Sequence, residues 1–161
     1  GDFARTMVRQ FFFDSYHLLL LEGLACGRDT EIAGIAGKVV KEVRYHLRHS
    51  SNWVIRLGDG TEESHARMQQ ALDDCAPCVP ELFEADQIYL DLESLSIVPE
   101  IHLLKSEWEH QVSGVLAEAT LQMPEILSAH TGGRQGLHSE YLGYILAEMQ
   151  FLQRAYPGAS W

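Results

Sequence analysis

The sequence predicts an all-α protein, a bundle of long helices, on three observations. Apolar residues recur at intervals of three and four along most of the chain, which is the period of one helix face. The second such stretch keeps its apolar stripe up to Gly58 and would form a helix about 40 Å long at 1.5 Å per residue. No segment alternates apolar and polar residues convincingly enough for a β-sheet. Long helices joined by short turns are typical of bundles.

The first helix is expected over residues 3–25 and is apolar on nearly every side. Cys26-Gly27 ends it, and Asp29-Thr30 can cap the helix that follows. The apolar surface of this helix must be buried, so we expect either another subunit to pack against it or further helices before residue 1. Its inward stripe is Met7, Phe11, Asp14, Leu18 and Leu21.

The second helix has the most regular stripe, and a turn separates it from a shorter third helix. Thr61 is expected to cap that third helix, which Pro77 and Pro80 then interrupt. Residues 86–92 are expected to form a brief strand or an ordered crossover. The stripe of the second helix is Ile32, Ala36, Val39, Val43, Leu47, Val54 and Leu57.

Two more helices complete the predicted bundle. The fourth is expected to start at Pro99 and to run as far as Met123-Pro124. The last is expected over residues 138–156, where Pro157-Gly158 ends it. The residues expected to face inward from the last helix are Tyr141, Ile145, Met149 and Leu152.

The composition fits an ordinary globular protein and narrows its partners. The length favours one domain, residues 1–161. Lys and Arg number 12 against 23 Asp and Glu, and the formal net charge of −11 disfavours nucleic acid and anionic membranes as partners. No apolar run approaches the ~20 residues of a membrane span. Three cysteines are too few for a disulfide framework, so we expect a cytoplasmic protein.

One segment of the second helix comes close to a di-iron ligand motif. Di-iron carboxylate bundles use Glu-x-x-His, because positions i and i+3 lie on one helix face. Here Glu42 is followed at i+3 by Tyr45. His46 is preceded at i−3 by Val43, so neither frame supplies both ligands. At about 100° per residue from Val43, His46 is expected to reach the interior, Glu42 to lie at its edge, and Tyr45 to point away.

Asp14 is the second candidate, because it lies on the inward stripe of an apolar helix, where a carboxylate needs a partner. We expect a hydrogen bond from it to the second helix, with His46 or Arg44 as the partner. The pair is either structural or a remnant or working carboxylate ligand. Asp14, Glu42 and His46 are therefore candidates for a vestigial metal site, and we expect this chain to hold no metal and to supply no catalytic residue.

Cys75 and Cys78 form an isolated Cys-x-x-Cys. A zinc site would need a second pair or two histidines at matching spacing, and a redox role would need a βαβ context. Neither is visible in the sequence. A small-molecule or thiol redox module stays open as one hypothesis for function.

Six segments of the sequence together carry a family resemblance: residues 41–48, 56–61, 68–71, 136–143, 146–154, and 157–158 with Trp161. They resemble the PaaC family, subunits of the ring-1,2-phenylacetyl-CoA epoxidase. The resemblance runs from residue 1 to residue 161. Residues 73–78 depart from the pattern, and the family carries further helices before the position of Gly1, so we expect an N-terminally truncated chain.

The resemblance implies a ferritin-like helical bundle that belongs to a multicomponent monooxygenase of aerobic phenylacetate catabolism. In that family the PaaA subunit holds the di-iron centre, and PaaC shares its fold but lacks its ligands. The resemblance thus implies a non-catalytic structural subunit that supports PaaA, with the rest of the epoxidase complex as further partners. Two alternatives stay open: a di-iron oxygenase subunit whose own site the missing N-terminal helices complete, and a homodimer.

Overall fold

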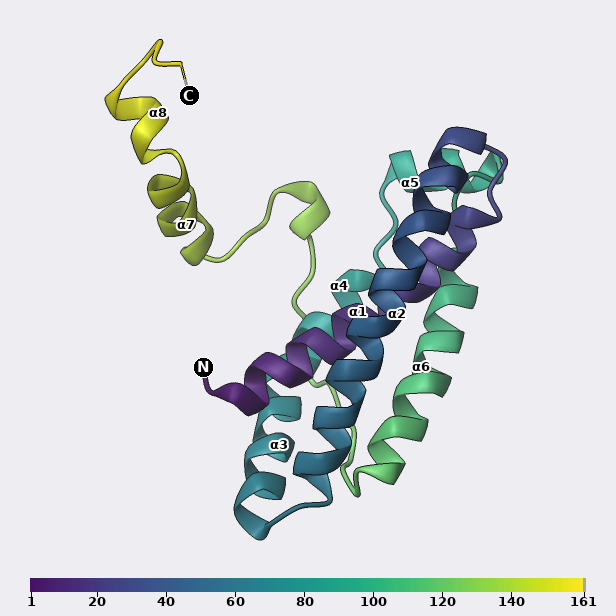
Figure 1. Ribbon diagram of the computed structural model, residues 1–161, viewed down its shortest axis with the longest axis vertical. Coiled ribbons are helices and arrows are strands. Elements are labelled where there is room, and N and C mark those ends of the chain that lie inside the picture. The colour runs from purple at the N-terminus through teal and green to yellow at the C-terminus, as the bar shows by residue number, and fades with distance from the viewer. Residues whose placement is uncertain (161) are drawn as a thin grey trace. The chain divides into compact units, whose positions relative to one another are not determined.

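The computed structural model describes residues 1–160 and is helical, with no strand among those residues. The all-α prediction is therefore confirmed, while Trp161 lies outside the described residues. No helix in this part of the chain is both long enough and apolar enough to span a bilayer. The chain forms two compact units, Gly1–Thr131 and Gly132–Trp161, which are described separately (Figure 1).

Two long helices form the centre of the N-terminal unit. α1 (Phe3–Ala25) and α2 (Thr30–Gly58) follow each other through a short turn and pack side by side (Figure 1). The Asp29 carboxylate caps α2 by accepting hydrogen bonds from the first backbone N–H groups of that helix. Both the extent of α1 and the cap of α2 agree with the sequence prediction.

α3 (Glu62–Cys75) packs against both long helices and begins as predicted. Thr61 and Ser64 form a reciprocal capping box at its start. A single 3₁₀ turn (Ala76–Cys78) and the short α4 (Val79–Leu82) follow, because the two prolines at positions 77 and 80 prevent the helix from continuing.

Of residues 86–92, predicted as a strand or crossover, residues 87–92 belong instead to a helix, α5 (Gln87–Ser94). The prediction missed its cap: the Asp86 side chain accepts the backbone N–H of Tyr89 at 2.8 Å. The Tyr89 hydroxyl then donates to the carbonyl of Pro99 at 2.8 Å. This bond fixes α5 to the start of the next helix.

α6 (Ile101–Glu118) ends before Met123-Pro124, where the sequence predicted its end. Thr120 adopts a left-handed conformation with φ of 59°. The N–H of Leu121 then returns to the carbonyl of Leu116, a pattern that closes a helix C-terminus without glycine. A threonine in this conformation gives no sequence signal, since it normally favours extended backbone.

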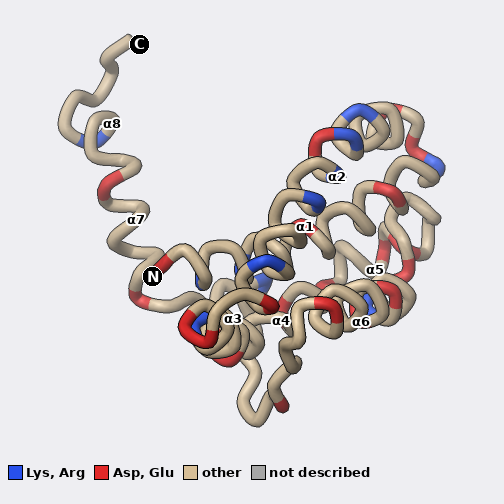
Figure 2. The backbone as a smooth tube through the Cα atoms, turned by 60° about the horizontal axis from the view of Figure 1, so that its bottom comes forward, with Lys and Arg blue, Asp and Glu red and all other residues tan. Residues whose placement is uncertain are grey.

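The main core lies where α1, α2, α3 and α6 meet, and Asp and Glu positions recur along the helices (Figure 2). Trp108 is 3% exposed, and its indole N–H donates to the carbonyl of Phe12 at 3.0 Å, which joins α6 to α1. The inward stripe predicted for α1 is buried throughout, whereas Ile32 of the α2 stripe is 38% exposed. The largest fully buried apolar side chains of this core are Phe11, Met68, Leu72, Val8 and Val54.

The C-terminal unit contains a 3₁₀ turn (Gly133–Gln135), α7 (Tyr141–Met149) and α8 (Phe151–Ala155). The single last helix predicted over residues 138–156 is therefore shorter and is divided at Gln150. The prediction that four of its side chains face inward was wrong, because two short helices offer too little surface to cover a stripe. The exposed fractions are 66% for Tyr141, 54% for Ile145, 70% for Met149 and 49% for Leu152.

Candidate functional site

A small polar cavity opens between α1 and α2, where the sequence predicted a vestigial metal site. Its volume is about 300 Å³. Gln10 and Asp14 line it from α1, and Tyr45, His46 and His49 line it from α2. Two of the three predicted residues, Asp14 and His46, thus share this cavity.

The Asp14 carboxylate is the buried centre of this arrangement, only 1% exposed. One oxygen, Oδ1, accepts a hydrogen bond from Nε2 of Gln10 at 2.6 Å. The other, Oδ2, accepts from the hydroxyl of Ser50 at 2.9 Å, and Ser50 itself is fully buried. The predicted hydrogen bond from Asp14 to the second helix is therefore confirmed.

The partners predicted for Asp14 were wrong, because Ser50 takes their place. Arg44 points to solvent and pairs with Glu22 of α1 at 2.6 Å. His46 lies off the inward stripe, and its side chain is 46% exposed. Ser50 follows Val43 by seven positions and therefore lies on the same, inward face of α2.

Glu42 and His46 do not form a ligand pair directed into the bundle. Their side chains are 73% and 46% exposed, and 3.9 Å separates His46 Nε2 from Glu42 Oε1. The expectation that His46 reaches the interior was thus wrong, since an offset of about 60° leaves its ring at the boundary with solvent. Tyr45 is 57% exposed, as predicted.

His17 is a member of this region that the sequence analysis missed. It follows Asp14 by three positions, and its ring lies 5.2 Å from that of Phe13. Burial lowers its pKa below 6.5, while the Asp14 carboxylate opposes the shift and His46 adds to it. At neutral pH this imidazole is therefore mainly uncharged and does not form an ion pair with the Asp14 carboxylate.

These residues do not fit a di-iron centre. Such a centre takes four carboxylates and two histidines from four helices. Here the one buried carboxylate has both oxygens engaged by neutral donors, the Gln10 amide and the Ser50 hydroxyl. Among residues 1–160, no three His, Cys, Asp or Glu side chains come together so that they could hold a metal ion. The arrangement is that of a polar pair that joins two helices.

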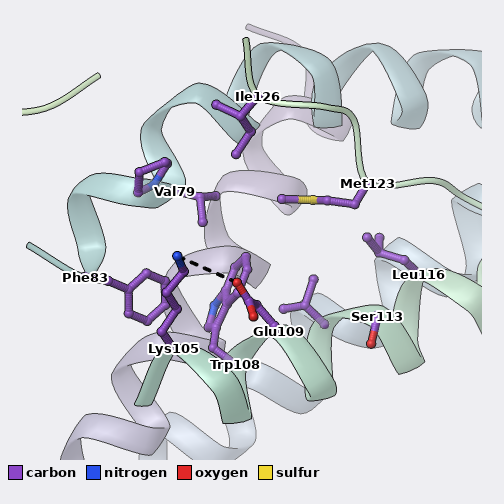
Figure 3. Close-up of a pocket in the computed structure, with 11 residues that line it drawn as sticks. Val79, Phe83, Lys105, Trp108, Glu109, Ser113, Leu116, Met123 and Ile126 are labelled. Carbon is purple, nitrogen blue, oxygen red and sulfur yellow. Dashed lines mark ion pairs between the residues drawn. The ribbon is translucent and has the colours of Figure 1, made fainter. Parts of the chain in front are cut away.

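A second hollow, of about 270 Å³, is apolar and lies against α4 and α6 (Figure 3). Trp108 and Phe83 form one side, and Met123 and Ile126 from the segment after α6 approach it from the other. Its charged groups are Lys105 and Glu109, which pair with each other at 3.9 Å. A hollow of this kind can accept an apolar group.

The Cys-x-x-Cys pair lies at the end of α3 and in the 3₁₀ turn that follows. Cys75 and Cys78 are both free thiols, and burial raises the pKa of each above 9.0. A redox-active cysteine needs the opposite shift, since the thiolate is the nucleophile. The structure thus gives no support to the redox hypothesis.

Comparison with known proteins places the chain in a family. The model of the phenylacetic acid catabolic protein family matches residues 1–161. The PaaC subunit of the 1,2-phenylacetyl-CoA epoxidase of Escherichia coli (strain K12) is 45% identical over 161 residues, which is the whole of this chain and 65% of that relative. The family is ferritin-like, which agrees with the helical fold. The chain belongs to the phenylacetic acid catabolic protein family.

Proposed function

We propose that this chain acts as a non-catalytic structural subunit of a phenylacetyl-CoA epoxidase and supports a PaaA-type subunit that holds the di-iron centre. The observation that carries the proposal is the 45% identity over the whole chain to the PaaC subunit of such an epoxidase. The E. coli protein is longer, and this chain spans 65% of its length. The role of the whole protein is inferred from that relative.

The geometry between α1 and α2 supports a structural role. The Gln10 amide and the Ser50 hydroxyl satisfy Asp14 within the fold, so this carboxylate needs no metal to be stable when buried. Glu42 and His46, the other two candidate metal ligands, have exposed side chains and do not join Asp14 as ligands in the interior of the bundle.

The surface of the C-terminal unit supports a role in assembly. Large apolar side chains are exposed along α7 and α8, and such patches are common where protein subunits meet. Tyr144 is 68% exposed, Met149 70% and Phe151 64%. This unit is therefore our candidate for contact with the partner subunits.

Metal analysis of the full-length protein tests the proposal. The protein is purified alone and also after co-expression with the PaaA-type subunit, and iron is measured in both samples. We expect iron only in the co-purified complex. Stoichiometric iron in the protein alone would overturn the proposal and establish the alternative, a di-iron site completed by helices outside this chain.

Two variants test whether Asp14, in the polar cavity between α1 and α2, contributes to iron binding. Asp14→Asn keeps the size of the side chain and removes its charge, and Glu42→Gln is the matched control at an exposed position. In a structural subunit, both variants leave the iron content of the complex and its turnover per assembled complex unchanged. Loss of iron in Asp14→Asn alone would show that Asp14 is a working ligand.

A further inference from the structure

A third pocket, with a volume of about 260 Å³, lies along the first half of α1, and the proposed function does not use it. α1 contributes Arg5, Arg9 and Phe13, which follow one another at intervals of four residues and therefore lie on one helix face. The opposite wall is the end of α3, with Cys75, and the 3₁₀ turn that follows it, with Cys78.

The walls of this pocket are mainly apolar, and its charged groups are few. Phe12, Val79 and Leu82 form the apolar part of its lining. The charged side chains that line it are Arg5, Arg9 and Asp74. A small apolar pocket with a few polar groups on one side is typical of a site for an amphipathic small molecule.

The three charged groups leave one positive charge unpaired. Arg5 Nη1 lies 3.4 Å from Asp74 Oδ2, so these two form an ion pair. Arg9 donates through Nη2 to the neutral amide oxygen of Gln10 at 3.3 Å, and none of the ion pairs among residues 1–160 includes it. A chain whose formal net charge is −11 thus presents a guanidinium without an acidic partner beside an apolar pocket.

We propose that this pocket binds a small organic carboxylate, with its carboxylate group on Arg9 and its apolar body between Phe13 and Leu82. A guanidinium binds a carboxylate through two parallel N–H···O bonds, which favours this anion over a spherical one. The pocket is slightly smaller than the usual range of ligand sites, which limits the body to a short acyl chain or a single ring.

The two thiols are suited to this role as uncharged walls. Burial is the main cause of the raised pKa of both Cys75 and Cys78, so they remain protonated at neutral pH. They therefore add polarisable apolar surface and do not compete with the ligand for Arg9.

The cysteines also supply the measurement. The full chain is alkylated with N-ethylmaleimide in the presence and absence of millimolar hexanoate, with sodium chloride at equal ionic strength as the reference. Peptide mass spectrometry follows each cysteine separately. We expect hexanoate to slow alkylation of Cys78 and Cys75 several-fold and to leave Cys26, which is exposed and outside the pocket, unchanged.

Substitution of Arg9 tests the role of its charge. We expect Arg9→Gln to weaken protection by hexanoate at least fivefold, and Arg28→Gln, an exposed arginine that does not line the pocket, to leave it unchanged. Hexanamide, the neutral analogue, should protect the wild type and Arg9→Gln equally. Hexanoate that fails to protect, protects all three cysteines alike, or protects Arg9→Gln as well as the wild type would overturn the proposal.

Discussion

Both units of the chain contain a helix with a regular apolar stripe, but the stripe is buried in the N-terminal unit and exposed in the C-terminal unit. In the N-terminal unit, the apolar stripe of α1 is buried, with Phe11 at 1% exposed. In the C-terminal unit, α7 has an equally regular stripe, yet Tyr141 and Met149 are 66% and 70% exposed. α1 packs against α2, α3 and α6, whereas α7 packs within its own unit against the short α8. The period of a sequence therefore identifies the apolar face of a helix but does not supply the surface that covers it.

The largest test of this contrast is truncation of one aromatic residue in each unit. Phe11→Ala leaves a cavity in the core and should lower the free energy of unfolding by about 3–5 kcal/mol. Tyr144→Ala removes a side chain that is 68% exposed and should cost less than about 0.5 kcal/mol. Urea unfolding followed by circular dichroism measures both. Equal losses would mean that the stripe of α7 is covered after all.

A second test compares two helix glycines. A Cβ at Gly58 of α2 would lie 2.5 Å from the carbonyl oxygen of Ala119, so Gly58→Ala should cost about 1–3 kcal/mol. A Cβ at Gly143 of α7 would meet nothing within 4 Å. Gly143→Ala should therefore favour the helix by about 0.5–1 kcal/mol. Thermal unfolding measures the effect of Gly58→Ala, and the helix content measured by circular dichroism tests the effect of Gly143→Ala. A neutral Gly58→Ala would show that α2 and residue 119 can move apart easily.

The third test separates the buried partner of Asp14 from the exposed one. Ser50→Ala removes the hydroxyl that donates to a buried carboxylate and should lower the free energy of unfolding by about 1–2 kcal/mol. His46→Ala removes a half-exposed ring and should cost less than about 0.5 kcal/mol. Chemical denaturation measures both losses of unfolding free energy, and the test is whether the loss for Ser50→Ala is the larger. A larger loss for His46→Ala would restore the partner first predicted from the sequence.

The smallest expected effect is a pH dependence from His17. Its folded pKa lies below 6.5, so the unfolded chain binds its proton more readily, and stability should fall as the pH drops below 6.5. Burial is the main cause of this shift, while the Asp14 carboxylate opposes it and the neighbouring His46 adds to it. His17→Gln should make the slope of stability against pH shallower over that window, and His102→Gln, at an exposed position, should not. Identical slopes for all three proteins would contradict the assignment.

Most of the fold could be predicted from the sequence where local signals decide it. The Asp29 and Thr61 caps and the buried face of α1 required only spacing and capping chemistry. The left-handed turn that closes α6 could not be predicted, because Thr120 is held in it by the bond between Leu121 and Leu116, not by its own preference.

The candidate site was predictable in part for a similar reason. A carboxylate on an apolar stripe stands out, so Asp14 was found. Its partner was missed because serine does not count toward an apolar period, although Ser50 shares a face of α2 with Val43 and Val54. The polar residue of α2 that bonds to Asp14 depends on how α1 and α2 are rotated about their axes relative to each other. This rotation is set by the packing of the two helices and cannot be read from either sequence segment alone.

The bond between the Trp108 indole and the carbonyl of Phe12 has an optical consequence. An indole that is 3% exposed is shielded from water, so it fluoresces at shorter wavelength than a hydrated one. Separation of α6 from α1 exposes that ring and moves its emission to the red, before either helix needs to lose its own backbone hydrogen bonds. In a protein whose other two tryptophans, Trp53 and Trp161, are replaced, the emission of Trp108 therefore reports whether α6 is packed against α1.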